Sequence, residues 1–550
     1  MAASALSFGL YARFEWPWLV LGWVALVPWL AALDRTLSLR DALGSGLLMS
    51  VAFELAVFGW FASAIQTYTG APVALAWLVL LLAAPLLQPQ LVAFALARHL
   101  ARRGATGATG LWRTALVGAG VYVGTEWAIP KLFADTLGYG LYPSVWMRQA
   151  ADVAGVHGLT FALVVANECM LAVARAMVGD APVGSELQRV VAAEAYASGR
   201  AKLRGVLAPA GCVAVLVVLL LAYGAFRCRQ LAGDDRRAGA FTAGVVQADI
   251  SRYDRLAAEL GKFDAVRMIL DTHFALSAEL LRRADLDLLV WPETVYPTTF
   301  GSPKSEDGAA FDREIGSFVA SAGVPLVFGA YDVEGQDEFN AAIFLGPSAD
   351  GRLTFETYRK ASLFPLTERV PALLESDLVR GWLPWLGTWR PGRGPQVVTL
   401  RLRDGRTLRI VPLICYDVLD PDLVLAAVRR GAEMIVTLSN DSWFASGAGP
   451  RLHLVGAAFR SIETRRPQVR ATNTGISAVI DPTGEFLAIA GVAERATLAA
   501  TVIPDGSTTT VLLVWGDWLG PSALACGVAL LAAPLVRRGA PVRRRYFPFF

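Results

Sequence analysis

Cysteine is scarce in this 550-residue sequence, and its spacing excludes several kinds of site. Five cysteines occur, and none forms a CxxC or CxxCH motif. A structural zinc site and an attached c-type haem are therefore disfavoured, and a disulfide framework has no support. Cys415 is the only cysteine between residues 240 and 505. A lone cysteine is most often a small buried hydrophobe, so its sequence context decides whether it is reactive.

Charge is sparse as well, and it is not concentrated in one long run. Charged residues make up 18% of the chain, the net charge is +3, and no basic tract is interleaved with aromatic residues. Nucleic acid is therefore disfavoured as a partner. The sequence also lacks GxGxxG and GxxxxGK[ST] motifs. Dinucleotide and P-loop nucleotide binding are thus without their usual fingerprints.

Apolar residues are abundant instead, at 55% of the chain with a mean hydropathy of +0.46. About 20 apolar residues are enough to cross a bilayer core of ~30 Å as a helix, and most of seven apolar stretches reach that length. The stretches are 17–33, 41–64, 71–97, 112–129, 153–178, 205–226 and 510–535. We predict an N-terminal transmembrane bundle over 1–230, a globular domain over 235–505, a transmembrane helix over 508–537 and a basic tail over 538–550.

Arginine and lysine near the ends of these stretches predict their orientation. The tail that follows the last stretch carries five arginines, which places it in the cytoplasm and the globular domain on the periplasmic side. The basic loops 34–40, 98–111 and 179–204 then also fall in the cytoplasm. The N-terminus is left outside unless residues 1–12 belong to a further span, and both alternatives stay open.

Four ionisable residues lie within or at the edges of the predicted spans: Glu54, Glu126, His157 and Glu168. Such residues usually face the interior of a helical bundle or a water-filled cavity. The other possibility is that they reach the membrane surface from a helix end. For Glu126, next to Trp127, the two interpretations weigh equally.

The segment between the sixth and seventh apolar stretches alternates short β-branched runs with helical patterns. Strands are predicted at 241–249, 286–293, 324–332, 397–405, 407–417 and 432–441, and helices at 253–283, 311–322 and 420–430. Asp420 is a plausible N-cap for the last helix, with Pro421 in its first turn. This alternation predicts a layered α/β domain.

Three reactive side chains lie at the boundaries of predicted segments. Glu293 ends "LLVWPE", Cys415 lies in "LICYD", and Lys360 precedes a proline-containing loop in "ETYRKASLFPLTERVP". Ligands of α/β sheets bind at strand ends, so the three could meet there. Glu293 could then deprotonate the thiol, while Lys360 and the Tyr416 N–H stabilise an oxyanion on the way to a thioester. Spacing alone does not establish this set, and the chemistry requires no metal.

The motifs around these residues resemble those of the nitrilase, or carbon–nitrogen hydrolase, superfamily. The matching segments are "WPETVYP" (291–297), "YRKASLFPLTERVP" (358–371), "LICYDVLDP" (413–421), "LSNDSWF" (438–444) and residues 453–485. With apolar stretches on both sides, the whole chain is similar to the apolipoprotein N-acyltransferase family. "TEWAIPKLFADTLGYGLYPS" (125–144) is similar to the re-entrant periplasmic region of that family.

The resemblance implies a fold and a set of roles. The fold is a polytopic α-helical membrane bundle joined to a nitrilase-like α-β-β-α sandwich. Glu293 is the general base, Lys360 stabilises the oxyanion and Cys415 is the acylated nucleophile. The supporting or substrate-binding residues would be Glu368, Tyr416, Asp417, Ser439 and Asn440. Neither a cofactor nor a metal is expected.

The implied activity is the last step of lipoprotein maturation in the bacterial inner membrane. A fatty acyl chain moves from a membrane phospholipid to the α-amino group of a diacylglyceryl-modified apolipoprotein, through a thioester. One alternative is a membrane-tethered amidase acting on a small amide, although the many spans argue against it. The other is a transporter or scaffold without catalysis, for which Cys415→Ser would be harmless.

Three departures from the family pattern leave details open. The family usually has glutamate two residues after the cysteine, where this chain has Asp417, so a role of that residue in acceptor contact is uncertain. A tryptophan expected after the first strand is replaced by Tyr253, which puts substrate-gating contacts in doubt. The first spanning helix also looks truncated, consistent with the open question about residues 1–12.

Overall fold

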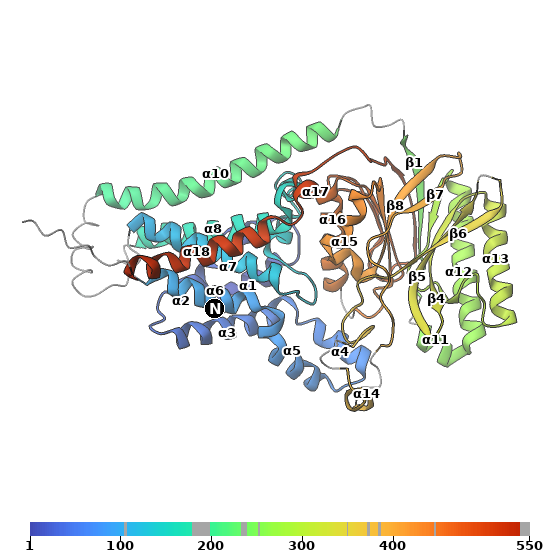
Figure 1. Cartoon of the computed structure of the whole chain (residues 1–550), viewed down its shortest axis with the longest axis horizontal. Helices are drawn as coiled ribbons and strands as arrows, with labels where there is room; N and C mark the ends of the chain where they lie inside the picture. Colours follow the sequence, from blue (N-terminus) through green and yellow to red (C-terminus); the bar gives the residue numbers. More distant parts are fainter. Residues whose placement is uncertain are drawn as a thin grey trace, which may run out of the picture.

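The computed structural model describes residues 1–103, 107–178, 199–232, 239–250, 253–348, 350–370, 375–382, 387–444 and 447–539. Figure 1 shows an elongated molecule with helices gathered at one end and two β-sheets at the other. Most of the basic loop 179–204 and all of the basic tail beyond residue 539 lie outside the described residues. The orientation predicted from the arginines of these segments therefore rests on the sequence alone.

The helical end is built from the N-terminal half of the chain together with its C-terminal helix. Its elements are α1 (Ala2–Tyr11), η1 (Trp18–Trp23), α2 (Val27–Leu33), α3 (Leu39–Val57), α4 (Phe61–Thr69), α5 (Val73–Leu87), α6 (Pro89–Arg102), α7 (Gly107–Ala128), η2 (Leu137–Leu141), η3 (Met147–Ala150), α8 (Ala151–Val178), α10 (Gly199–Leu231), α17 (Val511–Trp515) and α18 (Leu519–Gly539). Helix α18 packs against α7, so the end of the chain returns to the bundle.

Small residues allow α7 and α18 to approach closely. A Cβ added at Gly120 would lie 2.5 Å from the Ala523 carbonyl oxygen, and one at Gly124 would lie 2.5 Å from the Leu524 Cβ. Helices in membranes associate through such backbone proximity, because lipid tails provide no hydrophobic drive between them. Packing of this kind attaches the last helix to the bundle across nearly 400 residues of intervening chain.

Fewer helices qualify as complete membrane spans than the seven expected. In the described part of the chain, Met147–Val178 and Gly205–Leu231 are long and apolar enough to cross a membrane. The number rises to four if α3–α4, bent by 75°, and α5–α6, bent by 48°, each count as one span. The stretch 17–33 is not one helix but η1 followed by α2, which begins again next to Pro28.

The ionisable residues predicted within the apolar stretches all have polar partners in the structure. Glu54 accepts a hydrogen bond from Gln88, Glu126 pairs with Lys131, His157 with Asp517 and Glu168 with Arg98. Glu54, Glu126 and Glu168 are buried. Paired burial inside a bundle agrees with the expectation that they face inward and not toward lipid.

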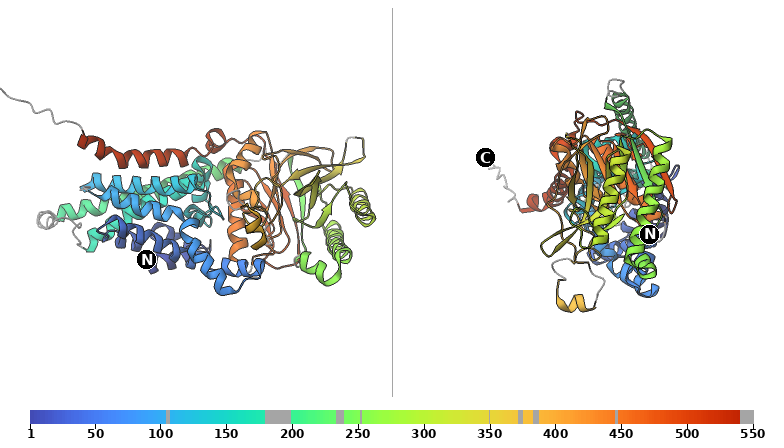
Figure 2. Two further views of the ribbon diagram at one scale, coloured as in Figure 1. Left: turned by 60° about the horizontal axis from the view of Figure 1, so that its bottom comes forward. Right: turned by 90° about the vertical axis from the view of Figure 1, so that its right-hand side faces the viewer.

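The globular end is an α-β-β-α sandwich, as expected. One sheet has the order β13-β1-β2-β4-β5-β6, with β3 paired to β4, and the other has the order β12-β11-β10-β9-β8-β7. Helices α12 and α13 cover the first sheet, while α15 and α16 cover the second and face the helical end (Figure 1). A second view keeps this layering, with α16 still between the bundle and the sheets (Figure 2).

The strands are β1 (Phe241–Gln247), β2 (Leu288–Val290), β3 (Tyr296–Thr299), β4 (Leu326–Glu334), β5 (Asp337–Pro347), β6 (Leu353–Arg359), β7 (Val398–Arg401), β8 (Thr407–Ile414), β9 (Met434–Ser439), β10 (Gln468–Thr472), β11 (Ala478–Ile480), β12 (Phe486–Ile489) and β13 (Ala496–Val502). The helices are α11 (Tyr253–Leu260), α12 (Lys262–Arg283), α13 (Glu306–Ala322), α14 (Asp377–Trp382), α15 (Pro421–Arg429) and α16 (Ala448–Thr464), with a short η6 (Cys415–Leu419). All six predicted strands are present. The predicted helix 253–283 is divided at Gly261, whose φ is +89°.

Three apolar layers hold the sandwich together. The inner faces of the two sheets form one core, including Val245, Val290 and Ile410, all of them fully buried. A second core lies between the first sheet and α12–α13, and a third between the second sheet and α15. The β8 strand contributes to the inner core and ends at Ile414, directly before Cys415, so packing of the two sheets places the sulfur-bearing residue.

Candidate active site

The three predicted catalytic side chains come from strand ends on both sheets. Glu293 follows β2 and Lys360 follows β6, both in the first sheet, whereas Cys415 follows β8 in the second. All three side chains are buried. The charges of Lys360 and Glu293 both act on the Cys415 thiol. The face-to-face packing of the sheets thus brings together residues 67 and 55 positions apart in the chain.

Lys360 lies between two carboxylates. Its Nζ is 2.7 Å from Glu368 Oε1 and 3.5 Å from Glu293 Oε1. Asn340 Nδ2 donates to Glu293 Oε1 at 2.7 Å and reaches Glu368 Oε1 at 3.4 Å. The backbone N–H of Asn440 donates to the other Glu293 oxygen at 2.9 Å. Glu293 is held from three sides, and Glu368, predicted as a supporting residue, contacts Lys360 and Asn340.

Cys415 occupies a strained turn at the end of β8. Its φ is +49°, a left-handed conformation that costs a non-glycine residue about 1–2 kcal/mol. It begins the short helix η6 and lies against a cavity with an empty volume of about 310 Å³. The walls are mainly aromatic and apolar, with Phe133, Phe364, Tyr416, Leu419, Trp443, Phe444 and Leu452 among them. Cys415 thus borders a space whose walls are largely apolar.

Burial and neighbouring charges determine the protonation of the site. Burial raises the pKa of the Cys415 thiol, and the Lys360 ammonium offsets only part of that rise. Burial also raises the pKa of Glu293 above its usual value, again against the pull of Lys360. Burial opposes the charge on Lys360, but Glu368 and Glu293 prevail and raise its pKa. Burial therefore favours the thiol form of Cys415, and a thiol becomes a nucleophile only when a base removes its proton.

Asp417 is a structural anchor and does not face the cavity. It is fully buried and accepts hydrogen bonds from the Tyr358 hydroxyl at 2.9 Å and from three backbone N–H groups, of Ala361, Ser362 and Ile414, at 2.6–3.1 Å. Burial raises the pKa of Asp417 to about 7. These bonds tie the Cys415 turn to the loop that carries Lys360. They occupy the Asp417 carboxylate, for which the sequence had left a contact with the acyl acceptor open.

The remaining predicted site residues divide between lining and positioning. Tyr416 lines the cavity and packs edge-to-face on Phe364, with ring centroids 5.1 Å apart. Ser439 and Asn440 do not line it, but they orient Asp441 and Glu293 respectively. Tyr253 packs against the core beside α12–α13, so it is not a wall of this cavity.

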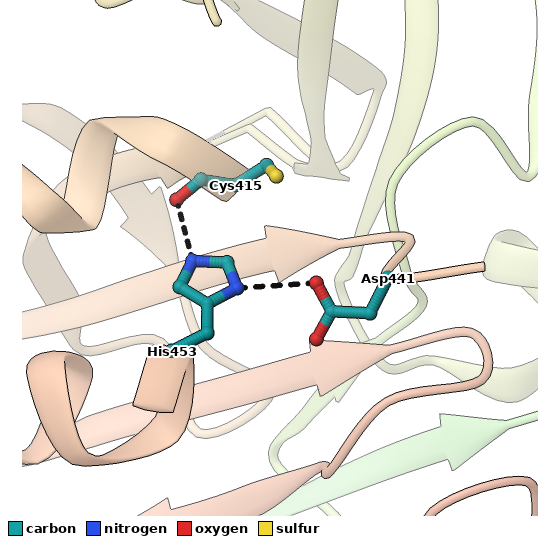
Figure 3. A group of neighbouring side chains, drawn as sticks. All are labelled: Cys415, Asp441 and His453. Carbon is teal, nitrogen blue, oxygen red and sulfur yellow. Dashed lines mark hydrogen bonds and ion pairs between the residues drawn. The ribbon is translucent and has the colours of Figure 1, made fainter. Parts of the chain in front are cut away.

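Four polar residues of the site were not predicted: Asn340, Asp441, His453 and Arg470. His453 Nε2 lies 3.1 Å from the Cys415 carbonyl oxygen, and His453 Nδ1 lies 3.1 Å from Asp441 Oδ1 (Figure 3). Arg470 donates to Asp441 at 3.1 Å and reaches His453 Nδ1 at 3.0 Å. Asp441, His453 and Arg470 do lie within segments that resemble the family motifs, 438–444 and 453–485, but Asn340 lies in none of them.

Cys415, His453 and Asp441 could be taken for a metal site or for a cysteine–histidine–aspartate triad. Their ligand-type atoms lie within 4.8 Å of one another. However, His453 is bonded to the backbone carbonyl of Cys415, and the cysteine side chain points away from the ring in Figure 3. Both Asp441 oxygens already accept hydrogen bonds, from Ser439 and Arg470. The Arg470 guanidinium already supplies the positive charge beside Asp441 that a metal ion would supply. The arrangement therefore favours neither a metal site nor a cysteine–histidine–aspartate triad.

A second apolar cavity lies beside the first, on the side of the helical region. It has an empty volume of about 560 Å³ and is lined by α1, α3 and η2 residues, with Glu126 and Asp135 at one wall. Leu452 of α16 lines both cavities. Aromatic pairs join the same two regions: Trp60 with Phe444, Phe61 with Trp443 and Phe133 with Phe364. Apolar contacts therefore link the helical region to the cavity beside Cys415.

Family models and relatives match both halves of the chain. The carbon–nitrogen hydrolase family model matches residues 242–510, and the model of the apolipoprotein N-acyltransferase N-terminal domain matches residues 3–169. An amidase from Nesterenkonia sp. is a similar solved structure, with 20% identity, a TM-score of 0.35 and coverage of 48% of this chain and 92% of that chain.

Curated relatives match along nearly the whole length. Apolipoprotein N-acyltransferase of Geobacter metallireducens is 27% identical over 94% of this chain and 91% of its own. That of Bdellovibrio bacteriovorus is 26% identical over 89% of this chain and 85% of its own. That of Pseudomonas syringae pv. tomato reaches 34% over 46% of this chain and 48% of its own. The chain belongs to the apolipoprotein N-acyltransferase family, whose N-terminal helical part is joined here to a carbon–nitrogen hydrolase domain.

Proposed function

We propose that this protein transfers a fatty acyl chain from a membrane phospholipid to the N-terminal α-amino group of a diacylglyceryl-modified apolipoprotein. The observation that carries the proposal is the placement of Cys415, beside a buried base and ammonium, in an apolar cavity that adjoins a cavity of the helical region. Hydrocarbon suits both spaces. The names of the full-length relatives support the same activity.

In the first half-reaction, Glu293 takes the proton of the Cys415 thiol as the sulfur attacks the ester carbonyl carbon of the phospholipid. The resulting oxyanion is stabilised by the Lys360 ammonium and by the Tyr416 N–H. The bond between the carbonyl carbon and the glycerol oxygen then breaks, and that oxygen takes the proton from Glu293. Lysophospholipid leaves, and the acyl chain remains on Cys415 as a thioester.

In the second half-reaction, the neutral α-amine of the acceptor attacks the thioester carbon. Glu293 accepts a proton from the attacking nitrogen, the carbon–sulfur bond breaks, and an amide forms. The sulfur leaves as a thiolate beside Lys360 and regains its proton from Glu293. The same three side chains serve both steps, and the apolar walls around Cys415 keep water away from the thioester in the interval.

The membrane context follows from the donor. Moving an acyl chain from the bilayer into water costs ~0.8 kcal/mol per CH₂. An enzyme that takes its acyl group from a phospholipid therefore has to bring its thiol to the membrane interface. We propose a transmembrane bundle over 1–230, a periplasmic catalytic domain over 235–505, an anchoring helix over 508–537 and a cytoplasmic tail over 538–550, in the bacterial inner membrane. The basic segments near the span ends support this orientation.

Mass spectrometry of the purified protein tests the proposal. After incubation with phospholipid vesicles, we expect a mass increase of one acyl group on Cys415 and its loss on addition of a diacylglyceryl-cysteinyl peptide. The Cys415→Ser variant is the matched control and should gain no thioester. Turnover of a small amide without acylation by phospholipid would indicate an amidase instead. Unchanged function of Cys415→Ser would indicate a protein without catalysis.

A further inference from the structure

A buried histidine contacts the backbone of the nucleophile and not its sulfur. His453, in α16, is 5% exposed, and its Nε2 lies 3.1 Å from the carbonyl oxygen of Cys415. A carbonyl oxygen only accepts hydrogen bonds, so Nε2 carries the hydrogen and His453 is the donor. In Figure 3 this bond lies on the side of Cys415 opposite to its sulfur. The interaction therefore fixes a backbone group directly adjacent to the reacting atom.

The constrained carbonyl belongs to the same peptide unit as the proposed oxyanion donor. In a trans peptide, the C=O of Cys415 and the N–H of Tyr416 lie in one plane and point in opposite directions. Holding the carbonyl toward His453 therefore directs the Tyr416 N–H toward the other side, where the sulfur lies. Because Cys415 has a positive φ, this peptide could relax to another orientation if the carbonyl were released.

His453 is itself held by a buried polar network. Asp441 lies 3.1 Å from His453 Nδ1 and accepts hydrogen bonds from Ser439 at 2.6 Å and Arg470 at 3.1 Å. Asp441 and Arg470 are buried. Between Ser439 and Asp441, the Asn440 N–H donates to Glu293. One turn after β9 therefore positions both the base, through Asn440, and the nucleophile turn, through His453.

We propose that His453 is a positioning residue for acyl transfer, which aims the Tyr416 N–H at the oxyanion by holding the Cys415 carbonyl. The inference rests on the proposed function, because it concerns the tetrahedral intermediate of that reaction. His453 moves no proton and acts through the Cys415 backbone, although it is also among the residues that line the cavity beside Cys415. Loss of an aligned oxyanion donor typically costs 10²–10³-fold in rate, which sets the size of the expected effect.

Two reactions of the same sulfur separate positioning from a general structural role. Acylation by phospholipid passes through an oxyanion, whereas alkylation by iodoacetamide displaces iodide from carbon and forms none. In His453→Leu we expect single-turnover acylation of Cys415 to slow roughly 10²-fold. Alkylation of Cys415 should stay within about threefold of wild type, and KM for phospholipid should be unchanged, because the loss falls on the transition state.

Side chains that restore the donor should restore the rate. His453→Gln places an amide N–H near the position of Nε2, while His453→Asn is one methylene shorter and falls short of the carbonyl. We expect His453→Gln to recover at least tenfold over His453→Asn, a comparison that holds even if His453→Leu does not fold. His273→Leu is the matched control: His273 is buried in α12, hydrogen-bonds to Ile269 of its own helix, packs its ring on Trp291 and should leave acylation unchanged.

The outcomes distinguish the two proposals. If wild-type protein forms no acyl-enzyme with phospholipid vesicles, the proposed function fails before the role of His453 is reached. If wild type acylates normally, then equal slowing of acylation and alkylation in His453→Leu would overturn the positioning role. Equal rates in His453→Gln and His453→Asn, or acylation of His453→Leu within threefold of wild type, would also overturn it.

Discussion

The protein buries two charge clusters that use the same chemical groups in different ways. In the helical region, Arg98 forms two hydrogen bonds with Glu168, at 2.5 and 3.0 Å, and one with Asp34 at 2.8 Å. In the globular region, Lys360 contacts Glu368 at 2.7 Å and Glu293 at 3.5 Å. Both cations are almost completely buried. The first cluster joins α6 to α8, and the second lies beside a cavity.

The difference lies in how fully each cluster is satisfied. The planar guanidinium of Arg98 matches the two oxygens of Glu168, and Arg102 and Arg175 add further cations around Asp34. Lys360 is a single point charge between two carboxylates, and a thiol stands nearby with its pKa raised by burial. A saturated cluster resists change and serves the fold. A cluster with one cation for two carboxylates can shift its protons, which fits the acyl transfer proposed for it.

Removal of the sulfur should produce the largest effect. In Cys415→Ala no thioester can form, so we expect acyl transfer to fall roughly 10⁴-fold or more. The melting temperature should change by only a few degrees, because the side chain is small and already faces a cavity. Acyl transfer to a lipopeptide and thermal unfolding in detergent measure the two quantities. Retention of more than about 1% of the rate would mean that another residue carries the acyl group.

Loss of the ammonium in the catalytic cluster should come next. In Lys360→Met, Glu293 and Glu368 lose their shared cation and the oxyanion loses a charged donor. We expect single-turnover acylation to slow roughly 10³-fold. Lys360→Arg keeps the charge but replaces a compact ammonium with a planar fork, so it should restore little of the rate. Acylation of Lys360→Met within tenfold of wild type would remove Lys360 from the proposed mechanism.

The helical cluster should respond in stability and not in chemistry. In Arg98→Met, Glu168 is left buried without its cation, which typically costs about 3–5 kcal/mol. We expect a lower unfolding temperature in detergent, while acylation per folded molecule stays at the wild-type value. Arg98→Lys is the matched control and should recover only part of the stability, because an ammonium cannot reproduce the paired contact with Glu168. A fall in acylation at unchanged stability would contradict this division between the clusters.

The sequence predicted the parts of the site that lie in contiguous motifs. Glu293 and Cys415 each follow an apolar run, Lys360 precedes a proline-containing loop, and the β-branched runs themselves marked β1, β2, β4, β7, β8 and β9. Short strands of mixed character, such as β3 and β11, carry no such signal. The lengths of apolar stretches also predicted seven spans, whereas two to four helices of the described residues qualify, because mean apolarity does not register where a helix stops and restarts, as it does at Pro28.

The residues that hold the catalytic groups were not predictable in the same way. Asn340 lies within β5, and only the pairing of β5 with β4 and β6 brings its amide to Glu293 and Glu368. His453 lies on an apolar helix and meets the Cys415 carbonyl only because α16 packs on the second sheet. Such contacts arise from tertiary packing between segments 28 or more residues apart, and single-sequence patterns carry no record of them.

The smallest effect concerns the pH dependence of the catalytic cluster. Burial raises the pKa of Glu293, while Lys360 and the Asn340 amide oppose that rise by stabilising the carboxylate. Glu293 must be ionised to take the thiol proton, so acylation should fall about tenfold per pH unit below that pKa, with its midpoint above pH 4.5. Asn340→Leu removes one stabilising donor, raises the pKa of Glu293 further and should move this acid limb to higher pH, with little change in the rate on its plateau.

Single-turnover acylation from pH 4 to 9 measures the limb, and Arg98→Met, altered only in the distant cluster, should leave it in place. A limb that moves to lower pH in Asn340→Leu would mean that the amide stabilises protonated Glu293, and a different group would then have to be the base.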